Sequence, residues 1–164
     1  MRLRRLLVPH DLSTHADRAL KVAAGLAGPS GKLLVLHVVV PIVPIADMSA
    51  AGGFYIPLGD LVASARKHLE RVVRRVGGRR GPKIRIEVVA GDPHRRILDE
   101  TRGMDAIVMS TVGRTGLSHL VMGSVAERVV RHSPIPVLTL RPDVARRAGR
   151  MRPTPIRRRA ARRR

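Results

Sequence analysis

The stretch AIVMSTVGRTGLSHLVMGSVAERVVRHSPIPVLTLR, at residues 106–141, decides the fold. It joins an apolar run at Ala106–Met109, a glycine-bearing loop at Ser110–Gly123, a polar-apolar segment and a second apolar run. Ser124 and Glu127 have the S-x-x-E spacing of a capping box, in which each side chain bonds an unpaired amide at a helix start. The stretch therefore predicts a buried strand, a loop, a helix and a second strand.

The glycine loop has the properties of an anion site. Amides in the first turn of a helix point outward without partners, and the helix dipole favours negative charge there. Gly113, Gly116 and Gly123 have no Cβ, so a phosphate can approach the backbone closely. The other interpretation is a structural turn that leads into a helix, and the glycine spacing is compatible with both.

The same segment resembles the universal stress protein family, in the subclass with the ATP-binding motif G-x2-G-x9-G-[ST]. Gly113, nine further residues and then Gly123 with Ser124 match the last three elements of this signature. Ser110 stands at the position of the first glycine. The text that follows Gly123 is also similar to the C-terminal part of family members.

The N-terminal half carries the resemblance further. Leu6–Ser13 is similar to the first strand and loop of the family, in which an acidic residue after Pro-x faces the adenine and ribose. Leu34–Val38 resembles its second strand, where the residue after His contacts adenine. The resemblance covers residues 3–141 and implies an adenine nucleotide alpha hydrolase-like fold, with five parallel strands in the order 3-2-1-4-5.

The resemblance also implies a ligand and its contacts. The ligand is an adenine nucleotide, ATP with or without magnesium, held between the loops that follow the first and fourth strands. Gly113, Gly116, Gly123 and Ser124 would contact the phosphates. Asp11 and the backbone of Val38 would contact the adenosine. The full set of implied binding residues is Pro9, His10, Asp11, Val38, Met109, Ser110, Gly113, Arg114, Gly116, Gly123, Ser124 and Val125.

Two of these residues have equally good structural interpretations. Asp11 precedes a predicted helix, so its carboxylate can cap that helix instead of bonding a nucleotide. Val38 can pack in the core as an ordinary strand residue.

Apolar periodicity predicts the same architecture without the resemblance. Strands and amphipathic helices alternate, which is typical of a doubly wound parallel sheet with right-handed crossovers. Ligands of such sheets bind beyond the carboxyl ends of the strands, where the strand order reverses. The expected strands are Arg4–Val8, Leu33–Val40, Ile84–Val89, Asp105–Met109 and Pro136–Leu140, and the expected helices begin after Ser13, at Leu61, after Asp92 (to about Arg102) and at Ser124.

Composition excludes several classes of chemistry. The chain has 164 residues and no cysteine, so disulfides, zinc-cysteine sites and thiol catalysis are excluded. Its seven histidines include no H-E-x-x-H pair, and neither a G-x4-G-K-[ST] loop nor a G-x-S-x-G elbow occurs. We therefore expect no metal site, no catalytic residue, and slow or absent ATP hydrolysis.

No stretch of the sequence predicts a membrane span. The longest apolar run, Leu33–Ile45, is interrupted by His37 and two prolines and is too short. The basic N-terminus leads into no signal-peptide pattern. We expect a cytoplasmic protein without membrane association.

The net charge of +20 predicts attraction to polyanions. Residues 142–164 hold ten arginines against one acidic residue, and three prolines, which predicts a disordered basic tail after a domain at residues 1–141. Arg146–Arg164 is expected to contact nucleic acid weakly and without sequence preference. The alternative is a tail that only increases solubility.

Taken together, the residues and the resemblance predict an adenine-nucleotide-binding stress-response sensor or regulator. We expect a homodimer joined through the apolar last strand, Ile135–Leu140, since an apolar edge invites pairing. Ser110 motivates an alternative, a dimeric interaction module of the same fold that does not bind nucleotide.

Overall fold

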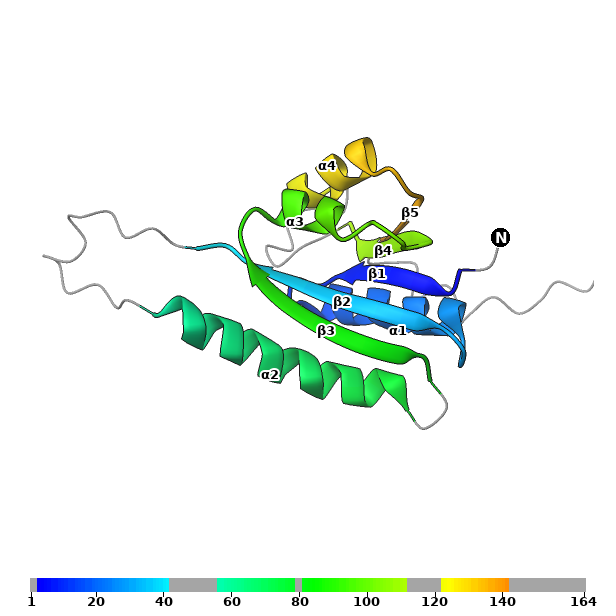
Figure 1. Ribbon diagram of the computed structural model, residues 1–164, viewed down its shortest axis with the longest axis horizontal. Coiled ribbons are helices and arrows are strands. Elements are labelled where there is room, and N and C mark those ends of the chain that lie inside the picture. The colour runs from blue at the N-terminus through cyan, green and yellow to red at the C-terminus, as the bar shows by residue number, and fades with distance from the viewer. Residues whose placement is uncertain (1–2, 42–55, 79–80, 112–121, 142–164) are drawn as a thin grey trace, which may run out of the picture.

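The computed structural model describes residues 3–41, 56–78, 81–111 and 122–141. Five parallel strands pair in the order β3-β2-β1-β4-β5, with helices between them along the chain, so the predicted fold and strand order are confirmed (Figure 1). The elements are β1 (Arg5–Pro9), α1 (Thr14–Ala27), β2 (Lys32–Val39), α2 (Leu58–Gly77), β3 (Lys83–Ala90), α3 (Pro93–Asp99), β4 (Ala106–Ser110), α4 (Ser124–His132) and β5 (Val137–Leu140).

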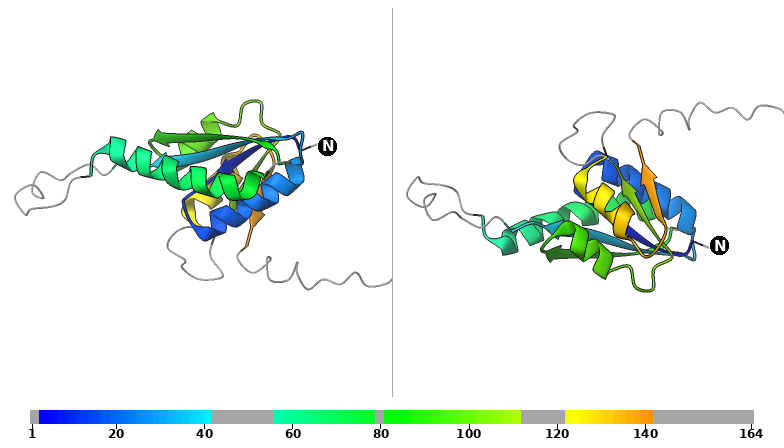
Figure 2. Two further views of the ribbon diagram at one scale, coloured as in Figure 1. Left: turned by 90° about the horizontal axis from the view of Figure 1, so that it is seen from below. Right: turned by 90° about the horizontal axis from the view of Figure 1, so that it is seen from above.

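Helices cover both faces of the sheet. α1 and α2 lie on one face and α3 and α4 on the other (Figure 2). Because successive strand residues point to opposite faces, each central strand supplies both cores. In β1, Leu6 and Val8 join the core under α1 and α2, whereas Leu7 joins the core under α3 and α4. This explains why the central strands read as continuous apolar runs.

Two helix starts are fixed as the sequence predicts. The Ser13 hydroxyl accepts a hydrogen bond from the Ala16 amide at 3.2 Å, and the Asp92 carboxylate accepts one from the Arg95 amide at 2.8 Å. Pro93 follows Asp92 at the first helical position, where its missing N–H costs nothing. Each of these helices therefore begins with a side-chain cap.

The capping box predicted at Ser124 and Glu127 is wrong. Gly123 is the N-cap of α4, Ser124 is already helical, and no side chain of the described residues caps this helix. The Glu127 carboxylate instead accepts a hydrogen bond from Arg131 at 2.9 Å, one turn further on. An S-x-x-E pattern shifted by one residue cannot form the reciprocal bonds, because the serine is inside the helix.

Other boundaries differ from the predictions by a few residues. α2 begins three residues before Leu61, and the strands β1 and β2 are each shifted by one residue. α3 ends at Asp99 because the Thr101 hydroxyl donates to the Leu98 carbonyl at 2.7 Å and closes the turn. β5 begins at Val137, because the Ser133 hydroxyl bonds both the amide and the carbonyl of Ile135.

One carboxylate ties the amino ends of the central strands together. Asp105, directly before β4, accepts hydrogen bonds from the amides of Arg4 and Arg5 at 2.8 and 2.7 Å. These bonds lower the pKa of the Asp105 carboxyl. The start of β1 is thereby fixed beside β4.

Within the described ranges, no helix is both long and apolar enough to cross a membrane.

Leu69 tests the core under α2. Its side chain is fully buried, so Leu69→Ala should lower the free energy of unfolding by about 2–5 kcal/mol. Leu26→Ala, on the exposed face of α1, is the matched control and should change it by less than about 0.5 kcal/mol. Urea denaturation measures both, and equal losses would contradict the assignment of the core.

Candidate functional site

A cleft of about 750 Å³ opens beyond the carboxyl ends of β1 and β4, where the strand order reverses. This volume lies within the range of small-molecule sites, about 300–1,000 Å³. The loops after these two strands form its sides, as the strand order predicts. Its described lining residues are Pro9, His10, Asp11, Leu12, Ala16, Leu36, His37, Val38, Val39, Val40, Leu61, Ser64, Ala65, Pro93, Ile97, Met109, Ser110, Thr111, Gly123, Ser124, Val125 and Ala126.

The loop after β1 is held in one shape by its own side chains. The Leu12 amide donates to Nδ1 of His10 at 3.1 Å, and the amide and hydroxyl of Ser13 both donate to Oδ1 of Asp11, at 3.1 and 2.6 Å. Leu12 has a φ of 66°, a left-handed conformation that costs a residue with a Cβ roughly 1–2 kcal/mol. The hydrogen bonds on either side hold it there.

His10 lies beneath the cleft and is 3% exposed. Since Nδ1 accepts from Leu12, the neutral ring carries its proton on Nε2, which lies 3.2 Å from a carboxylate oxygen of Asp17. Burial lowers the pKa of His10 to about 4, and this outweighs the attraction of Asp17 and Asp11 for a proton. The His10 carbonyl accepts a hydrogen bond from Nδ1 of His37 at 2.7 Å, which joins the loop to β2.

The opposite side of the cleft is the start of α4. The Gly123 amide donates to the Thr111 carbonyl at 2.8 Å, and the Thr111 amide donates to the Leu140 carbonyl at 3.0 Å. These bonds fix the first turn of α4 against the ends of β4 and β5. α1 and α3 begin with side-chain caps, whereas no described side chain caps α4, so the first amides of α4 border the cleft without a competitor among the described residues.

The two sides of the cleft differ in chemistry. Apolar side chains from β2, α2 and α3 form one wall, among them Val38, Leu61 and Ile97. Among the described lining residues, Asp11 is the one acidic side chain, and none is Lys or Arg. An anion bound in the described part of the cleft would therefore rely on backbone amides and hydroxyls.

The structure brings most of the predicted binding residues together. Three of them, Gly113, Arg114 and Gly116, lie outside the described residues. The remaining nine all line the cleft: Pro9, His10, Asp11, Val38, Met109, Ser110, Gly123, Ser124 and Val125. The two interpretations of Asp11 are partly resolved, because Ser13 is the cap of α1 and Asp11 supports that cap from outside the helix.

Several residues of the cleft were not predicted as part of a site. His37 was noted only as the neighbour of Val38, and nothing in the sequence indicated that its ring bonds the His10 carbonyl. Leu61 and Ala65 give no sign of a binding site in the sequence, because apolar residues on a helix are explained equally well by packing in the core. Thr111 gives no sign either, since both its amide and its hydroxyl bond the backbone carbonyl of Leu140.

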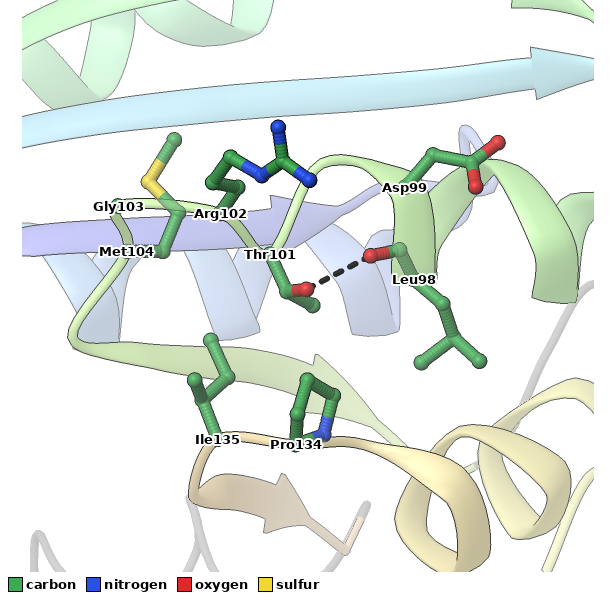
Figure 3. A pocket seen from close by; sticks show the side chains of 8 residues that line it. All are labelled: Leu98, Asp99, Thr101, Arg102, Gly103, Met104, Pro134 and Ile135. Atoms are coloured by element: carbon green, nitrogen blue, oxygen red, sulfur yellow. Dashed lines mark hydrogen bonds between the residues drawn. The ribbon is translucent and has the colours of Figure 1, made fainter.

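A second hollow, of about 680 Å³, lies at the amino ends of β4 and β5. The end of α3, the turn before β4 and the turn before β5 surround it (Figure 3). The Thr101 hydroxyl is already used by the Leu98 carbonyl. No lining residue comes from the carboxyl ends of the strands, so we take the cleft and not this hollow as the candidate site.

Comparison with known proteins agrees with the fold. The family model described as "Universal stress protein family" matches residues 2–141. This chain belongs to the universal stress protein family. Among curated universal stress proteins, MJ0531 of Methanocaldococcus jannaschii is 29% identical over 140 residues, covering 84% of this chain and 82% of its own length. A Thermus aquaticus member is 32% identical, covering 83% of this chain and 97% of its own length.

Solved structures of the universal stress protein family have the same fold. The structure of MJ0577, a Methanocaldococcus jannaschii member, is 27% identical with a TM-score of 0.68, covering 85% of this chain and 96% of its own. An Archaeoglobus fulgidus member in complex with dAMP has 22% identity and a TM-score of 0.57, with coverages of 85% and 98%. An Arabidopsis thaliana member with AMP bound has 23% identity and a TM-score of 0.53, with coverages of 84% and 90%. At such identities the last two establish the shared fold.

The buried His10 should make stability depend on pH. It stays neutral in the folded chain down to about pH 4, whereas in the unfolded chain it takes up a proton near its ordinary pKa of 6.5. The unfolded state then binds more protons, so this contribution to stability is present above pH 6.5 and is lost as the pH falls toward 4.

Urea denaturation at pH 7 and pH 5 measures this loss. His10→Asn keeps an oxygen acceptor for the Leu12 amide but removes the titrating ring, so it should lose less stability between the two pH values than the natural chain. An equal loss in both proteins would show that His10 is not the group responsible.

Proposed function

We propose that this chain binds an adenine nucleotide, ATP in preference, in the cleft between the loops after β1 and β4. The observation that carries the proposal is the first turn of α4, which no described side chain caps and which borders a largely apolar cleft across from the Asp11 carboxylate. Such a turn is an anion site, and an apolar cleft suits a purine ring. The AMP and dAMP complexes of the two family members support the same ligand class.

The adenosine half would lie against β2 and the loop after β1. Val38 and Leu61 provide apolar contact, and backbone groups of Val38 can bond the edge of the adenine. Oδ1 of Asp11 is held by Ser13, which leaves the other carboxylate oxygen for a ribose hydroxyl. A charge-assisted hydrogen bond of this kind is worth about 1.5–3 kcal/mol.

The phosphates would lie at the start of α4. The amides of Ser124 and Val125 and the Ser124 hydroxyl are the donors we assign to them, together with Gly113, Arg114 and Gly116 from outside the described residues. Magnesium would enter with the phosphates, because it binds chiefly through phosphate oxygens and water. Asp11 is the single carboxylate among the described lining residues, which is too few for a protein-made magnesium cage.

The site is suited to holding a nucleotide and not to cleaving it. No lysine lines its described part, and the buried His10 ring is neutral, with Nδ1 bonded to the Leu12 amide and Nε2 3.2 Å from an Asp17 carboxylate oxygen. We therefore assign the chain the role of a stress-response sensor or regulator that reports nucleotide occupancy to partners, with ATP hydrolysis slow or absent.

A homodimer is the second part of the proposal. β5 is an edge strand, and its Leu138 side chain is 40% exposed on that edge. Open strand edges with apolar side chains pair readily. Pairing through β5 does not require a bound nucleotide. The same dimer is therefore expected in the alternative, in which the protein is an interaction module that binds no nucleotide.

Gly123→Val tests the phosphate end of the site. A Cβ at Gly123 would lie 3.3 Å from the Thr111 carbonyl oxygen, and a branched side chain would occupy the approach to the first amides of α4. Isothermal titration with ATP should show at least a tenfold loss of affinity, which corresponds to about 1.4 kcal/mol.

Gly25→Val is the matched control for this experiment. Gly25 lies on the exposed face of α1, where an added Cβ meets nothing within 4 Å. This variant should keep the affinity of the natural chain. If Gly123→Val also keeps it, the phosphates do not lie at α4.

Leu138→Lys tests assembly. A charge on an edge strand opposes pairing, so the variant should sediment as a monomer at micromolar concentrations where the natural chain sediments as a dimer. Its ATP affinity should remain, because Leu138 lies outside the lining of the cleft. A natural chain that is monomeric under these conditions would disprove the dimer.

A further inference from the structure

The outward face of α2 carries a concentrated positive charge. Between residues 66 and 75 the helix presents five cations and one acidic residue, and all six side chains are exposed. The cations are Arg66, Lys67, Arg71, Arg74 and Arg75. The buried face of the same helix, with Leu69 and Val72, is packed on the sheet, so the charged face points away from the protein.

No described acidic side chain neutralises these five cations. The ion pairs among the described residues join Arg5 to Asp105, Arg85 to Glu87, Arg128 to Asp92 and Arg131 to Glu127. None of them involves α2. Glu70, within the patch, is not within 4.0 Å of a cation of the helix. The patch therefore keeps its positive potential toward solvent.

Helix geometry gathers the cations into a stripe. Lys67, Arg71 and Arg74 are spaced by four and three residues, which places them on one side of the helix. At 1.5 Å per residue, the stretch from Arg66 to Arg75 is about 13.5 Å long. A nucleic-acid duplex presents about one negative charge per 1.7 Å of its axis, so a stripe of this length faces several phosphates at once.

The composition of the surface favours a duplex over the other polyanions. α1 lies beside α2 on the same face and adds exposed Lys21 (Figure 2). Arginine binds phosphate through two parallel hydrogen bonds. The exposed residues of the stripe include no large apolar side chain to enter a bilayer. The sequence has one Phe and one Tyr, neither in α2, so this helix provides no Phe or Tyr ring as a stacking platform for unpaired bases.

We propose that the outward face of α2 binds the phosphate backbone of a nucleic-acid duplex without reading its sequence. The surface lies on the exposed side of α2, whereas the cleft is lined by Leu61, Ser64 and Ala65 of the same helix. Duplex binding and nucleotide binding therefore use different residues, and the failure of one proposal leaves the other standing.

The experiment compares three full-length variants that each remove three positive charges. The first is Lys67→Gln/Arg71→Gln/Arg74→Gln, on α2. The second, Arg95→Gln/Arg102→Gln/Arg131→Gln, lies on the opposite face, with exposed positions on or near α3 and α4. The third, Arg157→Gln/Arg158→Gln/Arg159→Gln, lies in the C-terminal tail. Circular dichroism and urea denaturation check that each remains folded.

Binding of a short fluorescent DNA duplex is measured by anisotropy across about 50–200 mM salt. Each phosphate contact contributes about 0.9 to the slope of log affinity against log salt, so the α2 variant should reduce the slope by about 2 to 3. The same reduction in slope is expected for the α2 variant with a second duplex of unrelated sequence. The opposite-face variant should leave the slope unchanged.

Three outcomes would overturn the proposal. Equal losses in the α2 and opposite-face variants would show that only net charge matters. If only the tail variant loses affinity for DNA, the contact belongs to Arg146–Arg164. If the α2 variant loses affinity for phosphatidylserine vesicles but keeps its affinity for DNA, the surface is a membrane contact instead.

Discussion

Parallel pairing along both edges of β1 is the constraint on which the rest of the structure depends. β1 pairs with β2 on one side and β4 on the other, and its three buried residues serve both cores. Chain connections run outward from it in opposite directions, toward β3 and toward β5. The loops after β1 and β4 consequently diverge, and the space between them is the cleft.

The same constraint accounts for the division of chemistry within the cleft. On the β1 side the loop is turned by hydrogen bonds that the His10 ring and the Asp11 carboxylate accept from Leu12 and Ser13, and Asp11 presents its carboxylate to the cleft. On the β4 side the chain enters α4 through Gly123, which presents amides. A ligand with a hydroxyl-bearing sugar at one end and an anionic group at the other matches both sides.

The fold could be predicted because its determinants are local and repeated. Continuous apolar strands alternate with amphipathic helices, and Ser13 and Asp92 mark two helix starts that the structure confirms. The start of α4 at Ser124 is as predicted, but its cap is one residue earlier, at Gly123, since glycine and serine are both acceptable caps. The buried bonds of His10 could not be predicted, because they depend on a side chain folding back beneath its own loop. Gly113, Arg114 and Gly116 stay predictions, since they lie outside the described residues.

The left-handed Leu12 has a consequence for the energetics of recognition. A loop that orders only when its ligand arrives loses conformational entropy at that moment, and the loss weakens affinity. Here the hydrogen bonds that His10 and Asp11 accept from Leu12 and Ser13 lie within the loop itself, so they fix the backbone around Leu12 as part of the fold. The entropy is lost during folding, so the loop is preorganised. A preorganised loop therefore affects the choice of ligand through its fixed shape, and ordering of this loop does not weaken the affinity.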